Sequence, residues 1–190
     1  MKKLRRDVPQ LDRMPRQLRA FELAAERGDS RAQLNLAAYL ASGDGAERDF
    51  KRAVFWYRKA AVQNDPEAIY NLGLMQMFGE GLKANVPRGI KMLEKAAQLG
   101  SPDAQQFLGD VLVAGYYGLK RDPEQAAYYY LRSLANGYPR AAMLLAAALE
   151  GRGKIGRAQL MNALNRVAVE SGVKATRPTP SNRAAKRRKM

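Results

Sequence analysis

Small and apolar residues recur along most of this chain at every third or fourth position. Ala68, Leu72 and Met75 form one such series, and Ala104 and Leu108 begin another of the same form 36 residues further along. Residues at these spacings lie on one face of an α-helix, whereas a half-buried strand alternates apolar and polar residues. The pattern therefore predicts a succession of short amphipathic helices.

Polar residues, prolines and glycines mark the ends of these helices. Asp65-Pro66 and Ser101-Pro102 each place a capping side chain before a proline at the first helical position, where the missing amide costs nothing. Glycines that suit a left-handed turn end the first helix of each unit, at Gly43, Gly79 and Gly115. A second capping residue then starts a second helix, at Asp49, Asn85 and Asp122. Each unit is thus predicted to be a pair of antiparallel helices.

The unit is repeated along the chain at a nearly constant period. Ala32, Ala68 and Ala104 are 36 residues apart, and Ala141 follows after 37. A fixed period of this size is typical of a solenoid of stacked hairpins. We expect a repeat domain over residues 13–170, with a single helix at its front. Its repeats are expected near 28–61, 64–97 and 100–134, with a degenerate copy at 137–170.

One stretch of the chain, from Gly28 to Ala61, carries a distinctive set of residues. They are Ala32-Gln33, Leu36, Tyr39, Gly43-Asp44-Gly45, Asp49, Lys51, Ala53, Trp56-Tyr57 and Lys59-Ala60-Ala61. This set resembles the Sel1-like repeat, a relative of the tetratricopeptide repeat, and the two later copies keep most of it. The resemblance implies an all-α fold, a right-handed α/α solenoid of about four helical hairpins with atypical capping ends. It also implies an adaptor in protein assemblies, and it supplies no catalytic residues.

The composition excludes several kinds of chemistry. The chain contains no histidine and no cysteine, which excludes disulfides, imidazole or thiolate metal ligands and nucleophiles activated by histidine. Asp49 and Asp122 recur in register, but helix capping explains their recurrence. Carboxylate-only chemistry stays formally open, yet no phosphate loop or dinucleotide-binding glycine pattern is present. We therefore expect no enzyme activity, no catalytic or metal-binding residues and no cofactor.

Apolar segments that direct a protein to a membrane are also missing from the pattern. No stretch has the length and apolar character of a transmembrane helix, and no apolar run of the signal-peptide type follows the basic residues near the N-terminus. The expected location is cytoplasmic.

The net charge of +15 is concentrated in the flanks of the repeats. Residues 21–150 contain equal numbers of basic and acidic residues, whereas the flanking segments carry the excess of lysine and arginine. Residues 1–12 form a basic lead, and residues 171–190 form a tail without apolar periodicity that is expected to be disordered. The tail ends in a basic cluster made of Arg183, Lys186, Arg187, Arg188 and Lys189.

Four interpretations of this basic cluster are open. Lysine and arginine on a flexible tether neutralise the phosphates of nucleic acid without reading its sequence. The cluster also resembles a monopartite nuclear localisation signal, which an import receptor reads. It could instead attach to an anionic protein or membrane surface, or it could serve only as a solubilising end.

Aligning the repeats position by position separates core residues from candidate contacts. Two columns are apolar or aromatic throughout and are predicted to be packing positions, namely Trp56, Met92, Tyr129 and Tyr57, Leu93, Tyr130. Columns that hold a charged residue in one copy are expected to face solvent. By this reasoning Phe55, Tyr128 and Leu131 are candidates for exposed contact with a partner protein. The alternative for the last two is that residues 151–170 cover them.

Tyr116 and Tyr117 lie where the third copy has one residue more than the others. Insertions in repeat proteins map to loops on one face, which is often the binding face. An exposed tyrosine pair would suit a partner protein. The alternative is that the aromatic rings fold back onto their own hairpin.

The sequence thus favours a non-enzymatic adaptor that holds a protein partner on the grooved face of its repeats. A second hypothesis is a nucleic-acid-associated accessory protein in which the basic termini do the main work. A third is a bacterial effector that uses its tail to enter a eukaryotic nucleus.

Overall fold

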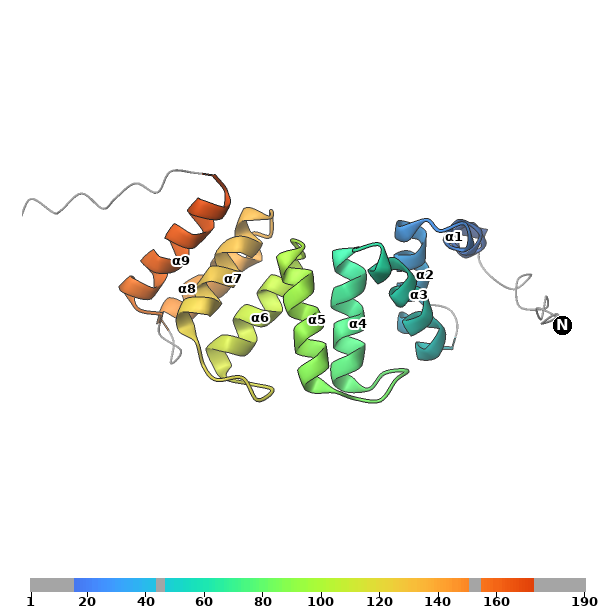
Figure 1. Cartoon of the computed structure of the whole chain (residues 1–190), viewed down its shortest axis with the longest axis horizontal. Coiled ribbons are helices and arrows are strands. Elements are labelled where there is room, and N and C mark those ends of the chain that lie inside the picture. The colour runs from blue at the N-terminus through green and yellow to red at the C-terminus, as the bar shows by residue number, and fades with distance from the viewer. Residues whose placement is uncertain (1–15, 44–46, 151–154, 173–190) are drawn as a thin grey trace, which may run out of the picture.

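The computed structural model describes residues 16–43, 47–150 and 155–172, and in these segments it contains nine α-helices and no strand. The helices are α1 (Arg16–Glu26), α2 (Ser30–Ser42), α3 (Phe50–Val62), α4 (Pro66–Phe78), α5 (Val86–Gln98), α6 (Pro102–Ala114), α7 (Pro123–Ala135), α8 (Arg140–Glu150) and α9 (Arg157–Glu170). They follow one another along the long axis of the molecule, with α1 at one end and α9 at the other (Figure 1). The prediction of an all-α repeat solenoid is confirmed.

The predicted capping residues occupy the ends of the helices. The side chain of Asp65 accepts hydrogen bonds from the amides of Glu67 and Ala68. Side-chain caps of the same kind begin the other helices from α2 to α7, at Asp29, Asp49, Asn85, Ser101 and Asp122. The predicted left-handed glycines end α2, α4 and α6, at Gly43, Gly79 and Gly115. These local predictions are confirmed.

Three helix pairs make up the body of the solenoid: α2 with α3, α4 with α5 and α6 with α7. In the second pair the two backbones come close where Gly73 faces Gly89, because a β-carbon added at Gly89 would lie 2.7 Å from the carbonyl oxygen of Gly73. In the third pair a β-carbon at Gly109 would lie 2.6 Å from the ring of Tyr130. Small residues at these crossings therefore allow the helices of a pair to pack closely.

Buried apolar side chains form three clusters along the row. The first joins α1 to α4, the second joins α4 to α6, and the third joins α7 to α9. The two columns predicted to be packing positions belong to these clusters. Their buried members are Trp56, Tyr57, Leu93 and Tyr130, and their half-buried members are Met92 and Tyr129. The assignment of these columns to the core is confirmed.

A pair of side-chain amides, of which Gln105 is buried and Asn136 is exposed, links α6 to the end of α7. Gln105 donates from Nε2 to the carbonyl oxygen of Ala97 at 2.8 Å, and its Oε1 accepts a hydrogen bond from Nδ2 of Asn136 at 3.0 Å. Gln105 is fully buried. Its polar atoms therefore depend on these partners, because water does not reach them.

The same amide pair occurs in one further repeat and is replaced in another. In the first repeat Gln63 donates to Gln33 at 2.9 Å. In the second repeat both positions are apolar, and they hold Ile69 and Leu99. The two positions thus change from polar to apolar together, which avoids leaving one buried amide without its partner.

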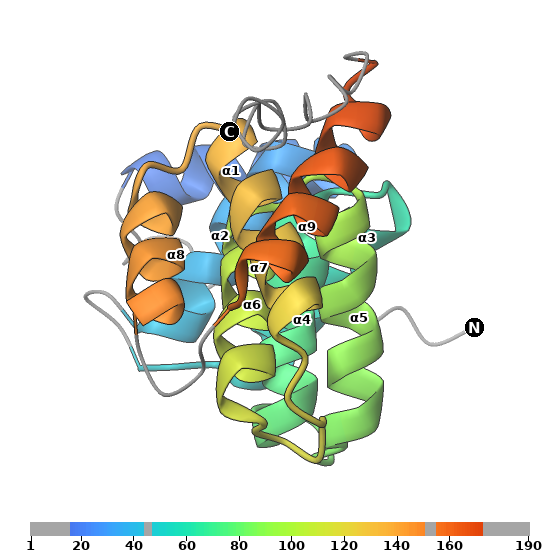
Figure 2. The same cartoon turned by 90° about the vertical axis from the view of Figure 1, so that its left-hand side faces the viewer.

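The last repeat departs from the regular arrangement at the end of the row. α9 does not pair with α8 in the way that α7 pairs with α6; it packs against α7. Figure 2 shows α8 and α9 on opposite sides of α7. The atypical capping end therefore consists of a helix laid on the outer face of the third repeat.

Polar contacts in a regular order hold α9 on α7. The residues of α9 that make them are spaced four apart, at Asn162, Arg166 and Glu170. Their partners on α7, in the same order, are Glu124, Gln125 and Tyr128, at 3.1, 2.8 and 2.8 Å. Because both series ascend together, the two helices run parallel.

Tyr128 lies at the centre of this contact. The guanidinium of Arg166 is 3.9 Å from the centre of the Tyr128 ring. Arg132 donates to the Tyr128 hydroxyl at 3.0 Å and forms an ion pair with Glu170 at 3.3 Å. Only 6% of Tyr128 is exposed. α9 thus covers an aromatic side chain that stands on the outer face of α7.

Substituting Gln105, the buried member of the amide pair, tests the contribution of the pair to stability. We expect Gln105→Ile to lower the free energy of unfolding by about 1–3 kcal/mol, because the carbonyl oxygen of Ala97 loses its buried donor. The double substitution Gln105→Ile with Asn136→Leu reproduces the apolar pair of the second repeat and should cost less than the two single changes added together. Urea denaturation followed by circular dichroism measures all three. Additive costs would contradict the joint role of the pair.

Removing the central ring of the α7–α9 contact should loosen α9 selectively. We expect Tyr128→Ala to speed amide hydrogen exchange in α9 by about tenfold, which corresponds to a modest loss of local docking energy. Exchange in α2 to α4 should stay unchanged. Tyr116→Ala, which removes an exposed ring, serves as the control. Unchanged protection of α9 in Tyr128→Ala would show that its polar contacts suffice.

Candidate functional site

A stripe of five exposed side chains follows the outer side of α3, and we call it the α3 face. It consists of Lys51, Phe55, Arg58, Lys59 and Val62. Spacings of four, seven, eight and eleven residues from Lys51 place these side chains along one side of a helix. Phe55 is 51% exposed and Val62 is 83% exposed. The α3 face is therefore partly apolar although water reaches it.

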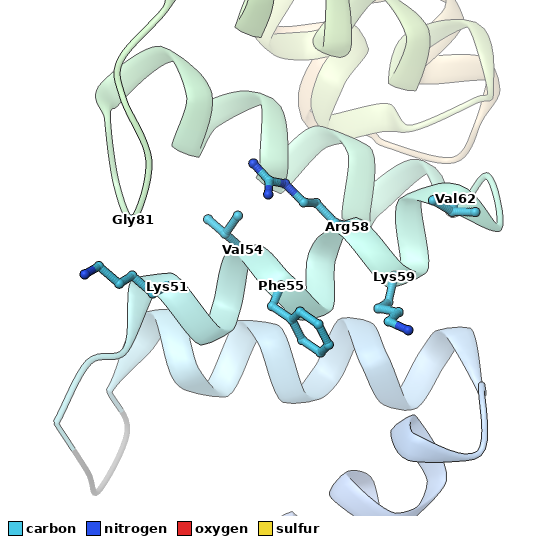
Figure 3. Close-up of a pocket in the computed structure, with 7 residues that line it drawn as sticks. All are labelled: Lys51, Val54, Phe55, Arg58, Lys59, Val62 and Gly81. Atoms are coloured by element: carbon cyan, nitrogen blue, oxygen red, sulfur yellow. The ribbon is translucent and has the colours of Figure 1, made fainter. Parts of the chain in front are cut away.

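An open cleft of about 570 Å³ lies over this face. It is lined by the α3 face together with Val54 and Gly81. In the view of Figure 3, Val54 and Arg58 project upward from α3, and Phe55 and Lys59 project downward. Lys51 and Gly81 stand at the end where α3 begins (Figure 3). All of the lining residues except Gly81 come from α3 itself.

The turn that follows α4 forms the rim of the cleft at the start of α3. Gly81 in this turn has a positive φ of 71°, and a β-carbon built there would collide with the carbonyl group of Phe50. Only glycine combines this conformation with so close an approach. The turn of the second repeat is therefore seated directly on the first residue of α3.

Phe55 is the aromatic residue among those described that line the cleft. Phe55 meets Trp56 edge to face with 5.0 Å between the ring centres. The ammonium of Lys59 is 5.6 Å from the centre of the Phe55 ring. On the inner side of α3, burial raises the pKa of Tyr57 to about 12. Tyr57 therefore stays neutral at physiological pH and adds no charge beneath the cleft.

The electrostatic character of the cleft is one-sided. Lys51, Arg58 and Lys59 are all exposed, and none of the described residues that line the cleft is an aspartate or a glutamate. In the described part of the chain, these three cations take part in none of the ion pairs, whereas Arg52 on the same helix pairs with Glu22 at 3.1 Å. The α3 face thus combines apolar surface with positive charge that has no acidic partner.

Of the three candidate contact residues from the helix columns, Phe55 is exposed as expected, whereas Tyr128 and Leu131 are not. Tyr128 is buried and Leu131 is half-buried in the third cluster. The expectation that these two residues are exposed is wrong, because α9 packs on α7. The alternative interpretation, in which residues 151–170 cover them, is the one the structure contains.

Tyr116 and Tyr117 belong to a group of rings that we call the aromatic cluster, which also includes Phe78 and Phe107. Tyr117 adopts a positive φ of 56° and stacks on Phe107 with 6.1 Å between ring centres. It also meets Phe78 edge to face at 6.2 Å. Tyr116 stays 64% exposed. Tyr117 therefore folds back onto neighbouring rings yet stays 43% exposed, so both tyrosines of the pair are reached by solvent.

Sequence reasoning missed part of the α3 face. Lys51, Lys59 and Val62 were not singled out, although their spacing from Phe55 places them on the same side of the helix. The residues four and seven positions from Phe55 on the same helix share its exposed side and could have been identified in this way. The candidate residues of the basic tail, 183–189, lie outside the described residues, as does the basic lead.

Other kinds of site find little support in the described segments. Residues 16–43, 47–150 and 155–172 contain no group of three or more acidic, histidine or cysteine side chains placed to hold a metal ion. None of the described helices combines the length and the apolar character needed to cross a bilayer.

Comparison with known proteins places the fold in a family. The family model described as Sel1 repeat matches residues 30–65, 66–101 and 102–138. No curated protein matches the chain. Among solved structures, it is similar to a Sel1 repeat protein from Oxalobacter formigenes, with 30% identity and a TM-score of 0.64 over 81% of this chain and 63% of the other.

A second similar structure is a protective antigen of uropathogenic Escherichia coli strains that displays an SLR fold. It has 29% identity and a TM-score of 0.63, over 80% of this chain and 33% of the antigen. This chain thus spans less than two thirds of either similar protein. The three matched repeats nevertheless cover more than half of its length, and the chain belongs to the Sel1 repeat family.

Proposed function

We propose that this chain is a non-enzymatic adaptor that holds a partner protein on the α3 face. The observation that carries the proposal is the open cleft, where Phe55 and Val62 are exposed beside three cations that have no acidic partner among the described residues. Sel1 repeats generally serve as protein–protein interaction scaffolds. A site of this composition fits that role, because aromatic and arginine side chains are enriched at protein interfaces.

The aromatic cluster offers a second contact surface on the same molecule. Phe78 is 53% exposed, Tyr116 is 64% exposed and Tyr117 is 43% exposed, so water reaches three rings of one group. Phe78 is also only three residues from Gly81, which forms the rim of the cleft. A partner that fills the cleft could therefore extend over the turn towards the cluster.

The adaptor hypothesis competes with nucleic-acid binding through the basic termini. The termini lie outside the described residues, so the nucleic-acid hypothesis stays a prediction from the sequence. The two hypotheses differ in a way that can be measured. A protein partner should resist nuclease and should not need the tail, whereas a nucleic-acid ligand should be lost with either.

A charge-reversal experiment tests the proposed site with a matched control. The variant Arg58→Glu with Lys59→Glu changes the α3 face, and Lys91→Glu with Lys95→Glu makes the same change of charge on the exposed face of α5. We expect capture of the partner from native cell extract to fall by about tenfold for the first variant only, because one interface loses its complementary charge. Quantitative mass spectrometry of affinity-purified protein measures the loss.

Two further arms complete this experiment. Nuclease treatment, and truncation of the chain to residues 1–173, should each leave the partner bound. If everything recovered disappears with nuclease or with the tail, the adaptor proposal fails and nucleic acid becomes the leading ligand. Equal losses for the two charge-reversal variants would show that overall charge, and not the α3 face, determines binding.

A further inference from the structure

The outer faces of α3, α5 and α7 can be compared residue by residue, because the three helices have equal length and equivalent places in successive repeats. One equivalent position is aromatic in two of the three helices, and it holds Phe55, Lys91 and Tyr128. The cation one turn further along stands at Lys59, Lys95 and Arg132. The three faces nevertheless differ in what covers them.

The face of α5 is an ordinary solvated surface. Lys91 and Lys95 are exposed, and Glu94 lies between them in the sequence. None of the large apolar side chains of α5 is exposed. Mixed charge without exposed apolar surface needs no partner, so α5 gives the baseline for this position in the repeat.

The α3 face resembles the covered face of α7 and not the solvated face of α5. Lys59 is 5.6 Å from the centre of the Phe55 ring, and Arg132 is 5.8 Å from the centre of the Tyr128 ring. The local pairing of cation and ring is thus repeated. The exposure differs, because Phe55 is 51% exposed and Tyr128, beneath α9, is 6% exposed.

The covered face shows which kind of element fits this position. α9 lies parallel to α7 and contacts it through residues spaced four apart, the last of which is Glu170. Glu170 accepts from Tyr128 and forms an ion pair with Arg132. The second helix of a repeat in this solenoid can therefore accept a parallel helix on its outer face. A carboxylate of the added helix then contacts both the cation and the aromatic ring.

Charge determines which helix suits the α3 face. At the first contact position, α7 has Glu124, which faces Asn162 of α9, whereas α3 has Lys51. At the position directly before Lys59 and Arg132, α3 has Arg58 and α7 has Leu131. The α3 face is thus more positive than the face that α9 covers, and a helix that binds it must be acidic.

The rest of this chain does not supply such a helix. α9 carries Arg157 and Arg166 against a single acidic residue and already occupies α7. Residues 173–190 contain no aspartate or glutamate. Residues 1–15 likewise hold more basic than acidic residues. These segments are therefore too basic to be the acidic occupant, and we assign it to a partner protein.

We propose that an acidic amphipathic helix of a partner protein docks on the α3 face, parallel to α3, in the way that α9 docks on α7. The helix places one carboxylate opposite Lys59, as Glu170 lies opposite Arg132. It places a second carboxylate eight residues earlier, opposite Lys51, and eight residues of helix span about 12 Å. This inference rests on the proposed function and specifies the structure, direction and charge of the partner segment.

Constrained helical peptides test the required spacing. A fluorescent peptide with glutamates at positions i and i+8 presents both on one side of its helix, whereas a peptide of equal composition with glutamates at i and i+6 does not. We expect the first peptide to bind the full-length protein about tenfold more tightly than the second. The Arg58→Glu, Lys59→Glu variant should lose this preference, and the Lys91→Glu, Lys95→Glu control should keep it. Fluorescence anisotropy measures these affinities.

Three results of the peptide experiment would overturn the inference. Equal binding of the two peptides would reduce the site to a general attraction for acidic chains. Absence of binding by both would show that the face does not accept an acidic helix. Displacement of the peptide by single-stranded RNA that binds more tightly through Arg58 and Lys59 would make the face a phosphate site.

A cross-linking experiment separates this inference from the proposed function. Val62→p-benzoylphenylalanine places a photoreactive group at the open end of the α3 face in the full chain. A cross-link to an acidic helical segment of the natural partner is the expected result. A cross-link to an extended or basic segment would overturn the helix inference and leave the adaptor function standing. If the purified partner forms no cross-link at this position, both proposals for the α3 face fail.

Discussion

The regular ends of the hairpin helices are the constraint on which this structure depends. From α2 to α7 every helix begins after a side-chain cap and contains thirteen residues. Left-handed glycines turn the chain at the end of α2, α4 and α6. Because the helices have equal length, equivalent side chains fall on the same face in each repeat. The glycine crossings, the aromatic columns and the likeness of α3 to α7 all follow from this regularity.

Where the repeats differ, residues that contact each other have changed together. The paired amides of Gln105 and Asn136 have apolar counterparts at both positions in the second repeat. The same reasoning applies at the surface, where Tyr128 is aromatic and α9 is present to cover it. Phe55 breaks this correspondence, since it keeps the aromatic side chain and has no covering helix in the described chain. That mismatch is the physical basis for assigning a partner to the α3 face.

Local signals predicted the repeat and its helix ends, because a cap, a proline or a glycine acts within a few residues. Asp65 and Gly79 could be interpreted without knowledge of the rest of the chain. The exposure of Tyr128 could not, since it depends on Glu170, which is 42 residues away. A period of 36 residues describes what the repeats share and does not encode how the terminal helix departs from them. The charge of the cleft could have been predicted, because Lys51 and Lys59 lie four residues on either side of Phe55, whose exposure was expected from the repeat columns. The rim at Gly81 could not, since it depends on a contact between two repeats.

The contact between Gly81 and Phe50 makes the cleft a joint product of two repeats. Every cation of the α3 face belongs to the first repeat, yet the rim that closes one end belongs to the turn of the second. The first repeat alone would therefore present the same side chains on an open helix without a boundary. Its recognition surface exists only while the neighbouring repeat is folded and stacked, so binding at α3 is tied to the cooperativity of the array.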